Sequence, residues 1–281
     1  MKVFKFGGAS VKDAAGVKNL SSIVHQQHGQ LIVVVSAMGK TTNLLETLCN
    51  AYFHQDPEAT AVMKELKDFH LNIVTSLFPL NAPVYKHLEE LFINLENILA
   101  SESSLCYDYE YDRIICFGEL ISTTIISDYM EMEGIENQFI DIRKFLKTDQ
   151  NYRNANIDLE LSEQLCKEAF DFKASSTFVT QGFIAGTRTN QTTTLGREGS
   201  DYTAALLANL LNAENVTIWK DVPGVMNADP KEYEKAQVIS RMSYKEAIEL
   251  SHFGAKVIHP KTIKPIQNKQ IPLYVRSFLH P

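Results

Sequence analysis

The stretch with the clearest chemical potential runs from residue 196 to residue 208. Gly196 and Gly199 leave its first half free for close backbone approach, and from Ser200 onward Ala and Leu recur at helical spacing. We therefore predict a loop that becomes a helix, with Ser200 as its N-cap. The unpaired N–H groups of the first turn and the helix dipole favour an anion, and Arg197 could grip a carboxylate or a phosphate. Asp201, at the first helical position, either stabilises the helix or serves the site.

A second candidate site opens the chain. Residues 2–6 predict a short strand, which is followed by the turn Gly7-Gly8-Ala9-Ser10 and by a helix over about 11–28. A strand, a Gly-rich turn and a helix N-terminus together can cradle a phosphate, although this spacing is not GxGxxG. Lys5 lies just before the turn, where its ammonium group could meet that phosphate. The alternative is a lysine on an edge strand that faces water.

A similar turn follows the apolar run at residues 31–36, which predicts a buried parallel strand. The triplet Gly39-Lys40-Thr41 suggests a P-loop, but the first glycine of that motif would fall on Val34 inside the strand. We therefore reject a P-loop. What remains is a hydroxyl-rich turn, including Thr42, before a helix from about Leu44. It lies at the carboxyl end of a strand, where open α/β sheets bind ligands.

Glu119 is the one acidic residue in a nearly apolar segment. Residues 114–126 have almost no polar face within a helix predicted over about 112–132. A helix that is apolar all round is buried, and a carboxylate buried without a partner costs several kcal/mol. Glu119 therefore needs a cation, either a structural lysine or arginine or the ammonium group of a ligand.

The elements that must position these residues alternate along the chain. Strands are predicted at 2–6, 31–36, 137–142, 176–180, 215–219 and 273–278, with helical stretches between them. This alternation predicts an α/β fold with a mostly parallel sheet covered by helices on both faces. The helices predicted over 57–101 are expected to be packing elements that cover the rest of the fold. The polar segment 147–156 and the Gly-punctuated segment 181–187 are expected to be loops.

Composition narrows the class of protein. The 281 residues, 44% of them hydrophobic and 22% charged, can form one large domain or two coupled lobes. A net charge of −7 argues against a surface for nucleic acid or anionic membrane. We find neither an apolar signal region nor a run of 18 apolar residues, so we expect a cytoplasmic protein. The four cysteines, at 49, 106, 116 and 166, do not have metal-ligand spacing, and in their apolar or helical contexts we expect reduced, buried thiols. His25 and His28 form an HxxH on a predicted helix, but no carboxylate or third ligand accompanies them, so we expect a surface helix rather than a metal site.

Six motifs, in order from one end of the chain to the other, together resemble the aspartate kinases. They are KFGGAS from Lys5, VSAMGKTTN from Val35, FGE from Phe117, GREGSDYTA from Gly196, WKDVPGV from Trp219 and SHFGAKVIHP from Ser251. The resemblance implies the amino-acid kinase fold, a three-layer αβα sandwich with a mostly parallel central sheet. It implies one domain over 1–281, with an aspartate-binding lobe over about 1–195 and an ATP-binding lobe over about 196–281. L-Aspartate, ATP and Mg²⁺ are the small molecules that it implies.

The resemblance also implies roles for individual residues. Glu119 would hold the aspartate α-ammonium group and Arg197 its α-carboxylate, while Thr42 and Ser200 would help to seat the substrate. Lys5 would stabilise the charge that develops during transfer, and Asp201 would orient that lysine. The positions that contact the nucleotide would be Lys5, Gly7, Gly8, Ser36, Lys220, Asp221, Met226, Lys231 and Lys256. No residue is assigned as a metal ligand, because Mg²⁺ would bind mainly through the ATP phosphates.

The implied reaction is attack of the aspartate β-carboxylate on the γ-phosphate of ATP, which gives β-aspartyl phosphate and begins the route to lysine, threonine and methionine. A carboxylate with a pKa of about 3.9 is already ionised at pH 7, so no general base is needed. The site must instead bring two anions together and neutralise charge on the phosphoryl oxygens. We expect polar loops, including Thr148 and Asp149, to close and exclude water.

Some features depart from the family pattern. Ala9, Glu198, Lys220, Met226 and Lys231 stand where threonine, glycine, threonine, an aromatic residue and arginine are common. Family members usually continue into regulatory ACT domains, whereas this sequence stops at Pro281, so we do not assume feedback inhibition. The oligomeric state stays open, with a homodimer as one option. Two other functions also stay open: a kinase of the same superfamily that acts on acetylglutamate, glutamate or UMP, and a non-enzymatic sensor or inactive partner subunit.

Overall fold

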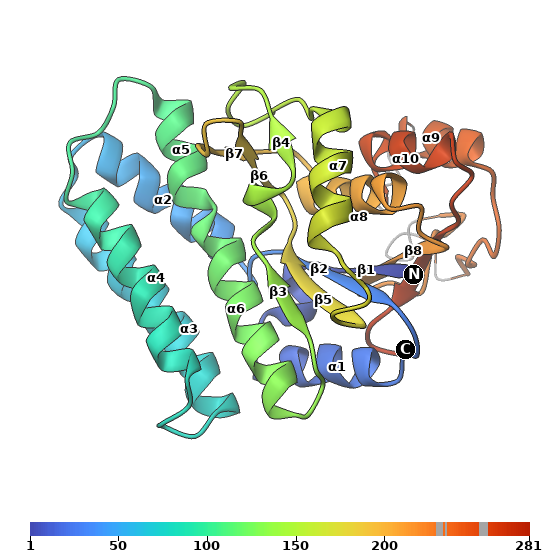
Figure 1. The fold of residues 1–281 in the computed structure, drawn as a ribbon, viewed down its shortest axis with the longest axis horizontal. Helices are drawn as coiled ribbons and strands as arrows, with labels where there is room; N and C mark the ends of the chain where they lie inside the picture. The colour runs from blue at the N-terminus through green and yellow to red at the C-terminus, as the bar shows by residue number, and fades with distance from the viewer. Residues whose placement is uncertain (229–232, 234, 253–257) are drawn as a thin grey trace.

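A six-stranded parallel sheet forms the centre of the molecule (Figure 1). The computed structural model describes residues 1–281 except 229–232, 234 and 253–257. The strands of this sheet are β1 (Lys2–Phe6), β2 (Leu31–Val35), β3 (Gln138–Ile140), β5 (Thr177–Gln181), β8 (Asn215–Lys220) and β9 (Leu273–Ser277). Their order across the sheet is β3-β5-β2-β1-β8-β9, and each neighbouring pair is parallel. The predicted parallel sheet is confirmed.

The strand order reverses at β1, which is the switch point of the sheet. From β1 the chain first builds the side with β2, β3 and β5, and later returns to build β8 and β9 on the other side. Phe6 pairs in register with Val35 of β2 and with Trp219 of β8, so the three strands end at the same level. Ligands in open α/β sheets bind in the crevice at the carboxyl ends of the strands at such a point.

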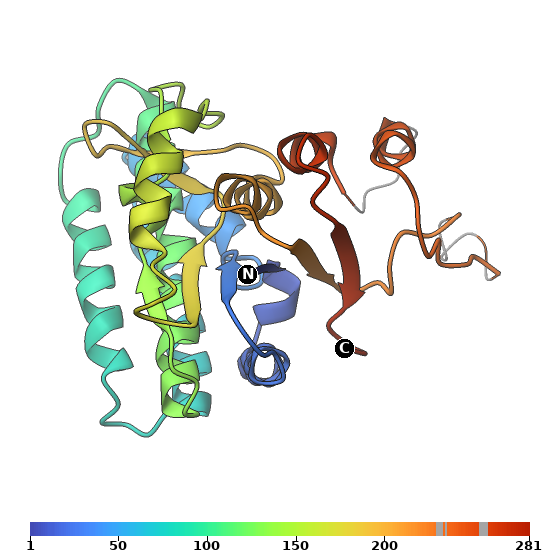
Figure 2. The same ribbon diagram turned by 45° about the vertical axis from the view of Figure 1, so that its right-hand side comes forward.

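Helices cover both faces of the sheet, as the sequence predicts. Figures 1 and 2 place α1 (Ala14–His25) and α8 (Gly199–Leu210) on opposite sides of β1. The helix α6 (Phe117–Met132) shares the side of α1, while α7 (Leu159–Ala169) and α10 (Pro260–Gln267) pack against α8. The remaining helices are α2 (Thr41–Phe53), α3 (Glu58–Leu77), α4 (Val84–Leu99), α5 (Tyr107–Ile115) and α9 (Tyr244–His252). The result is an α/β sandwich of three layers.

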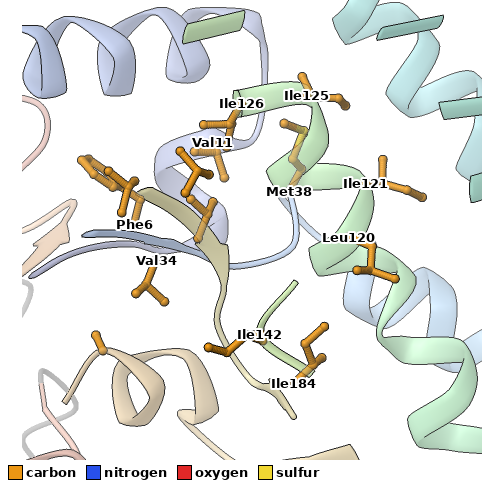
Figure 3. Close-up of a cluster of buried hydrophobic side chains, with 14 of the residues drawn as sticks. Phe6, Val11, Val34, Met38, Leu120, Ile121, Ile125, Ile126, Ile142 and Ile184 are labelled. Atoms are coloured by element: carbon orange, nitrogen blue, oxygen red, sulfur yellow. The ribbon is translucent and has the colours of Figure 1, made fainter. Parts of the chain in front are cut away.

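The core is built from β-branched and aromatic residues of the central strands. All five residues of β2 are buried, as expected for a strand covered on both faces. Figure 3 shows part of the cluster in which Phe6 of β1 and Val34 of β2 join α6 side chains such as Ile121 and Ile125. Packing against both faces fixes the strand ends, and therefore the residues that immediately follow them.

A second, smaller sheet was not predicted from the sequence. It consists of β4 (Lys147–Thr148), β6 (Ile184–Thr187) and β7 (Thr192–Thr194), in the order β4-β6-β7. These strands are two to four residues long. β4 and β6 fall in the segments expected to be loops, 147–156 and 181–187, and β7 follows the second of these segments. Strands this short carry too little alternation of apolar and polar residues to be recognised.

Several predicted boundaries were wrong. The single helix expected over 112–132 is two helices, α5 and α6, that meet at Cys116. The helix expected from Leu44 begins at Thr41, and the helix expected from Ser200 begins at Gly199. Among the four cysteines, Cys49, Cys116 and Cys166 are buried and Cys106 is exposed. Among the described helices, none is both long and apolar enough to cross a membrane.

Candidate active site

A pocket of about 400 Å³ lies at the carboxyl ends of the central strands, at the N-terminus of α8. It brings together seven of the site residues assigned from the sequence, and these come from four of the six motifs: Lys5, Ser36, Thr42, Glu119, Arg197, Ser200 and Asp201. The lining residues are Lys5, Ser36, Thr42, Tyr111, Glu119, Arg153, Phe183, Thr194, Gly196, Arg197, Glu198, Gly199, Ser200 and Asp201. The predicted substrate-binding group, Thr42, Glu119, Arg197 and Ser200, is therefore assembled in one cavity.

Lys5 and Asp201 form a buried ion pair in this pocket. The Lys5 Nζ lies 2.7 Å from Oδ1 of Asp201, and the Lys220 Nζ lies 3.5 Å from Oδ2 of the same carboxylate. β1 lies between β2 and β8, and Lys5 is 8% exposed, so the alternative of an edge lysine facing water was wrong. Burial raises the pKa of Asp201, but the charges of Lys5 and Lys220 outweigh this effect and hold it below its usual value. Asp201 therefore stays ionised at neutral pH.

The two glycines after β1 serve different purposes. A Cβ atom on Gly7 would lie 3.2 Å from the Lys5 Nζ, so the glycine keeps room beside that ammonium group. A Cβ on Gly8 would lie 2.8 Å from the carbonyl oxygen of Ala37 and 2.9 Å from that of Gly39. Gly8 therefore lets the β1 turn pack directly on the turn after β2.

The N-terminus of α8 differs in detail from the prediction. Gly199 is the first helical residue and Glu198 occupies the N-cap position, with φ 55° and no side-chain cap bond. The prediction of Ser200 as the N-cap was therefore wrong. Ser200 is instead 8% exposed, and it packs where a Cβ on Gly182 would lie only 2.5 Å from its own Cβ. Gly199, Ser200 and Asp201 of the first turn of α8 line the pocket, and no side chain caps the turn. Unpaired N–H groups at a helix N-terminus suit an anion.

Glu119 lies in the first turn of α6 and is 2% exposed. Its Oε1 accepts a hydrogen bond from the Ala37 N–H at 3.1 Å, while Oε2 has no hydrogen-bond partner among the described residues. Gly118 permits this approach, because a Cβ there would lie 2.8 Å from the Cβ of Ala37. Burial raises the pKa of Glu119 to about 8, against the opposing effects of the backbone hydrogen bonds and of Lys5. A cationic group that entered the pocket would find an unsatisfied carboxylate oxygen.

The turn after β2 supplies hydroxyl groups to the same cavity. Ser36 follows β2 directly, with its N–H bonded to the Phe6 carbonyl and its own carbonyl bonded to the hydroxyl of Ser122. Thr42 lies in the first turn of α2 and lines the pocket. Its neighbour Thr41 contacts the buried ring of His70, whose Nε2 lies 3.4 Å from the Thr41 hydroxyl oxygen.

The residues assigned to the nucleotide are distributed differently. Lys220 ends β8 and does not line the pocket itself, but it forms an ion pair with the pocket residue Asp201. Asp221 is exposed just beyond β8, and Met226 forms an isolated bridge with Val238. Neither Asp221 nor Met226 is among the described residues that line the pocket. Lys231 and Lys256 lie outside the described residues.

Four residues of the pocket wall were missed by the sequence interpretation: Tyr111, Arg153, Phe183 and Thr194. Phe183 has φ 68°, and its N–H donates to the hydroxyl of Thr203 in α8, which fixes the turn against the helix. Its position after Gly182 was the only available signal. Thr148, expected in a closing loop, is instead buried in β4 and bonded to the hydroxyl of Thr193.

The pocket combines cations, helix N–H groups and one buried carboxylate that carries an unsatisfied oxygen. Lys5 and Arg197 suit anionic groups, whereas Glu119 suits an ammonium group. Among the described residues, no group of three or more His, Cys, Asp and Glu is placed to hold a metal ion. Such an arrangement can bind a zwitterion next to a second anion.

Known proteins with similar sequences include several aspartokinases. The chain is 34% identical over 281 residues to lysine-sensitive aspartokinase 3 of Escherichia coli (strain K12), which covers 99% of this chain and 62% of that protein. It is 33% identical over 285 residues to bifunctional aspartokinase/homoserine dehydrogenase 1 of Zea mays, covering 99% of this chain and 31% of that protein. The chain therefore spans less than two thirds of the length of these relatives.

Solved structures agree with the sequence comparison. The crystal structure of E. coli aspartokinase III in complex with aspartate and ADP matches with a TM-score of 0.91 at 32% identity, over 100% of this chain and 62% of that chain. Aspartate kinase from Clostridium acetobutylicum matches with a TM-score of 0.80 at 28% identity, over 99% and 60%. The resemblance to aspartate kinases noted in the motifs is confirmed. Since the profile of the Amino acid kinase family matches residues 1–277, the chain belongs to that family.

Proposed function

We propose that this protein is an aspartate kinase, which transfers the γ-phosphate of ATP to the β-carboxylate of L-aspartate. The observation that carries the proposal is that Glu119, Arg197 and Lys5 line one pocket. A carboxylate with an unsatisfied oxygen and a guanidinium group suit the ammonium and the α-carboxylate of an amino acid. This leaves the side-chain carboxylate of the substrate for the part of the pocket that holds Lys5. Thr42 and Ser200 complete the acceptor site in this proposal.

The transfer itself needs charge stabilisation more than proton transfer. The attacking β-carboxylate is ionised at pH 7, so no base is required. Lys5 neutralises charge on the transferring phosphoryl group, and Asp201 holds the Lys5 ammonium in position through the 2.7 Å ion pair. The N–H groups at the N-terminus of α8 and the Ser36 hydroxyl add donors around the same anion.

The nucleotide would lie beyond Lys5, over the turn that contains Gly7 and Gly8. The space that a Cβ on Gly7 would take next to the Lys5 Nζ suits a phosphate oxygen. In the proposal Lys220, Asp221 and Met226 contact the nucleotide, as do Lys231 and Lys256 from outside the described residues. Both oxygens of Asp201 already face lysines, so this carboxylate does not suit a metal ion. Mg²⁺ would instead be held by the ATP phosphates and would neutralise part of their charge.

The comparisons support the same proposal. One similar structure contains aspartate and ADP, and several similar proteins are bifunctional aspartokinase/homoserine dehydrogenases. The division into an aspartate-binding lobe over about 1–195 and an ATP-binding lobe over about 196–281 is also part of the proposal. Strands of both segments share one sheet, so the two lobes would be halves of one domain. A cytoplasmic location and a homodimer also remain predictions.

The test is formation of an acyl phosphate. The protein is incubated with ATP, Mg²⁺ and L-aspartate, and the product is trapped with hydroxylamine as aspartyl hydroxamate. Glutamate, acetylglutamate and UMP serve as competing acceptors. We expect an aspartate-specific product. The Lys5→Met variant should form none, and the Glu119→Gln variant should need about 100-fold more aspartate than wild type to form it. Turnover of one of the other acceptors would identify a different kinase of the family, and nucleotide binding without any turnover would favour a sensor.

A further inference from the structure

Arg153 is a second arginine, besides Arg197, in the wall of the acceptor pocket. It lies in the turn that connects β4 to α7, with its backbone in the left-handed region at φ 64°. This conformation favours glycine and is uncommon for a long side chain. An arginine therefore keeps this position only because its surroundings hold the backbone there.

Asp112 is the group that holds it. This α5 residue is fully buried, and both of its carboxylate oxygens accept the Arg153 N–H, at 3.2 and 3.0 Å. The same carboxylate accepts the Thr194 N–H at 2.8 Å and the Thr194 hydroxyl at 2.7 Å. Burial raises the pKa of Asp112 to about 6, while these hydrogen bonds lower it. One buried carboxylate thus joins the turn of Arg153 to the end of β7, and Arg153 and Thr194 both line the pocket.

The loop of Arg153 also packs directly on the loop of Arg197. A Cβ on Gly196 would lie 3.1 Å from the Arg153 carbonyl oxygen and 2.8 Å from the side-chain oxygen of Asn154. Lys261 of α10 bonds both sides of this contact, with its Nζ 2.9 Å from Asn154 Oδ1 and 2.6 Å from the Leu195 carbonyl. The two arginines are therefore carried by segments that are fixed to each other.

The guanidinium group of Arg153 is held by contacts with Tyr111 and Asp108, and it keeps N–H donors that could bind a ligand. Its central carbon lies 4.3 Å from the ring centre of Tyr111, which also lines the pocket. Within the part of the chain that the structure describes, its one ion pair is with Asp108 at 3.3 Å, between side chains that are 43% and 54% exposed. Such exposed pairs are weak, and a guanidinium carries five N–H donors. A stacked, half-exposed guanidinium suits a carboxylate that approaches its edge.

We propose that Arg153 is a specificity-determining residue that binds the α-carboxylate of the acceptor together with Arg197, and that Asp112 is the positioning residue that holds it there. The inference rests on the proposed aspartate kinase function. It extends that function because Arg153 would favour acceptors with a free α-carboxylate over acceptors in which this group is blocked. Two guanidinium groups can satisfy both oxygens of one carboxylate, whereas a neutral amide at that place loses acceptors and the charge.

The test compares two ligands that differ only in this group. L-Aspartate and L-isoasparagine, in which the α-carboxylate is an amide and the β-carboxylate is free, are titrated calorimetrically into wild type and Arg153→Gln in the presence of a non-hydrolysable ATP analogue. We expect Arg153→Gln to weaken L-aspartate binding about tenfold or more and to change L-isoasparagine binding less than twofold. Arg188→Gln, a matched change in an arginine that pairs with Asp158 outside this pocket, leaves both affinities unchanged.

Equal losses for the two ligands would mean that Arg153 acts only on structure, and an unchanged affinity for L-aspartate would place it outside the acceptor site. Either result overturns the inference. The positioning role of Asp112 is tested by Asp112→Asn, which should weaken L-aspartate binding in wild type and much less in the Arg153→Gln background. Additive losses would contradict that role.

Measurements on the wild type show separately whether the kinase proposal fails. Binding of L-aspartate without phosphoryl transfer from ATP would contradict the proposed reaction, while the Arg153 binding comparison would remain valid. A wild type that does not bind L-aspartate at all would overturn both.

Discussion

The Lys5 Nζ and the Asp201 Oδ1 lie 2.7 Å apart, although β1 begins the chain and α8 comes after more than two thirds of it. The pair exists because α8 crosses the face of the sheet at β1, so its first turn meets the end of that strand. Asp201 is fully buried and also faces Lys220. The carboxylate therefore organises two cations at the switch point of the sheet.

Replacing Asp201 with asparagine tests this organisation. We expect Asp201→Asn to lower kcat by about 100-fold and to lower the free energy of unfolding by about 3–5 kcal/mol, because it leaves the buried Lys5 and the half-buried Lys220 without their counter-charge. The measurement is steady-state kinetics with urea unfolding at pH 7. An active, fully stable variant would show that the ion pair contributes to neither catalysis nor stability.

The same pair predicts a dependence of stability on pH. Since the folded pKa of Asp201 lies below its usual 3.8, its contribution is present above that value and is lost as pH falls through the folded pKa. The difference in unfolding free energy between wild type and Asp201→Asn should therefore shrink below about pH 4. A constant difference between pH 7 and pH 3 would contradict the lowered pKa.

The two glycines after β1 should respond differently to alanine. Gly8→Ala brings a Cβ within 2.8 Å of the Ala37 carbonyl oxygen, which is backbone and cannot move freely. It should cost about 1–3 kcal/mol of stability. Gly7→Ala meets only the end of the Lys5 side chain, so it should leave stability within about 1 kcal/mol and lower kcat about tenfold. Thermal unfolding and kinetics of the two variants would separate these effects, and the reverse pattern would contradict the assigned roles.

Glu119 should release a proton when aspartate binds. Its pKa of about 8 means that most molecules carry a protonated Glu119 at pH 7, whereas an ammonium group favours the ionised form. Binding should therefore release about one proton at pH 7, and aspartate affinity should rise as pH increases from 6 toward 8. Calorimetry in two buffers with different ionisation enthalpies measures the release. Glu119→Gln is the control, and a wild type without buffer dependence would exclude the ammonium contact.

His70 predicts acid sensitivity away from the reacting groups. Burial lowers its pKa to about 4, since its ring lies between α3 and Thr41 of α2. A lowered folded pKa means that the protein loses stability as pH falls from about 6.5 toward 4, by up to roughly 3 kcal/mol. His70→Gln should lose less stability than wild type over this range. Equal losses, measured by urea unfolding at pH 7 and pH 4.5, would show that His70 is not the titrating group.

Much of the fold could be predicted because its central strands have a clear signature. The unbroken apolar run of β2 and the strand–turn pattern of β1 gave correct elements, and their alternation with helices gave the parallel sheet. The small sheet β4-β6-β7 could not be predicted, since strands of two to four residues are stabilised by their partners rather than by local pattern.

Much of the site could also be predicted, because the signals came from residues in the wrong environment. The glutamate in an apolar helix pointed to a cationic partner, and the lysine before a Gly-rich turn pointed either to a phosphate or to an exposed edge strand. The structure places Lys5 and Glu119 in one pocket. Arg153 gave no such signal within its polar loop. Its position depends on Asp112, a contact between segments far apart in the sequence. Glu198 is a related case: it has the left-handed backbone that suits glycine, the residue common at this position in the family.

Chemical identification of the product tests the central claim most directly. The protein is incubated with ATP, Mg²⁺ and L-aspartate, and the acyl phosphate is reduced in place with borohydride, which converts the phosphorylated carboxyl group to an alcohol. Phosphorylation of the β-carboxylate predicts homoserine, in amounts that Lys5→Met and Glu119→Gln strongly reduce. Recovery of the isomer reduced at the α-carboxyl group, or of unchanged aspartate from an enzyme that consumes ATP, would contradict the account.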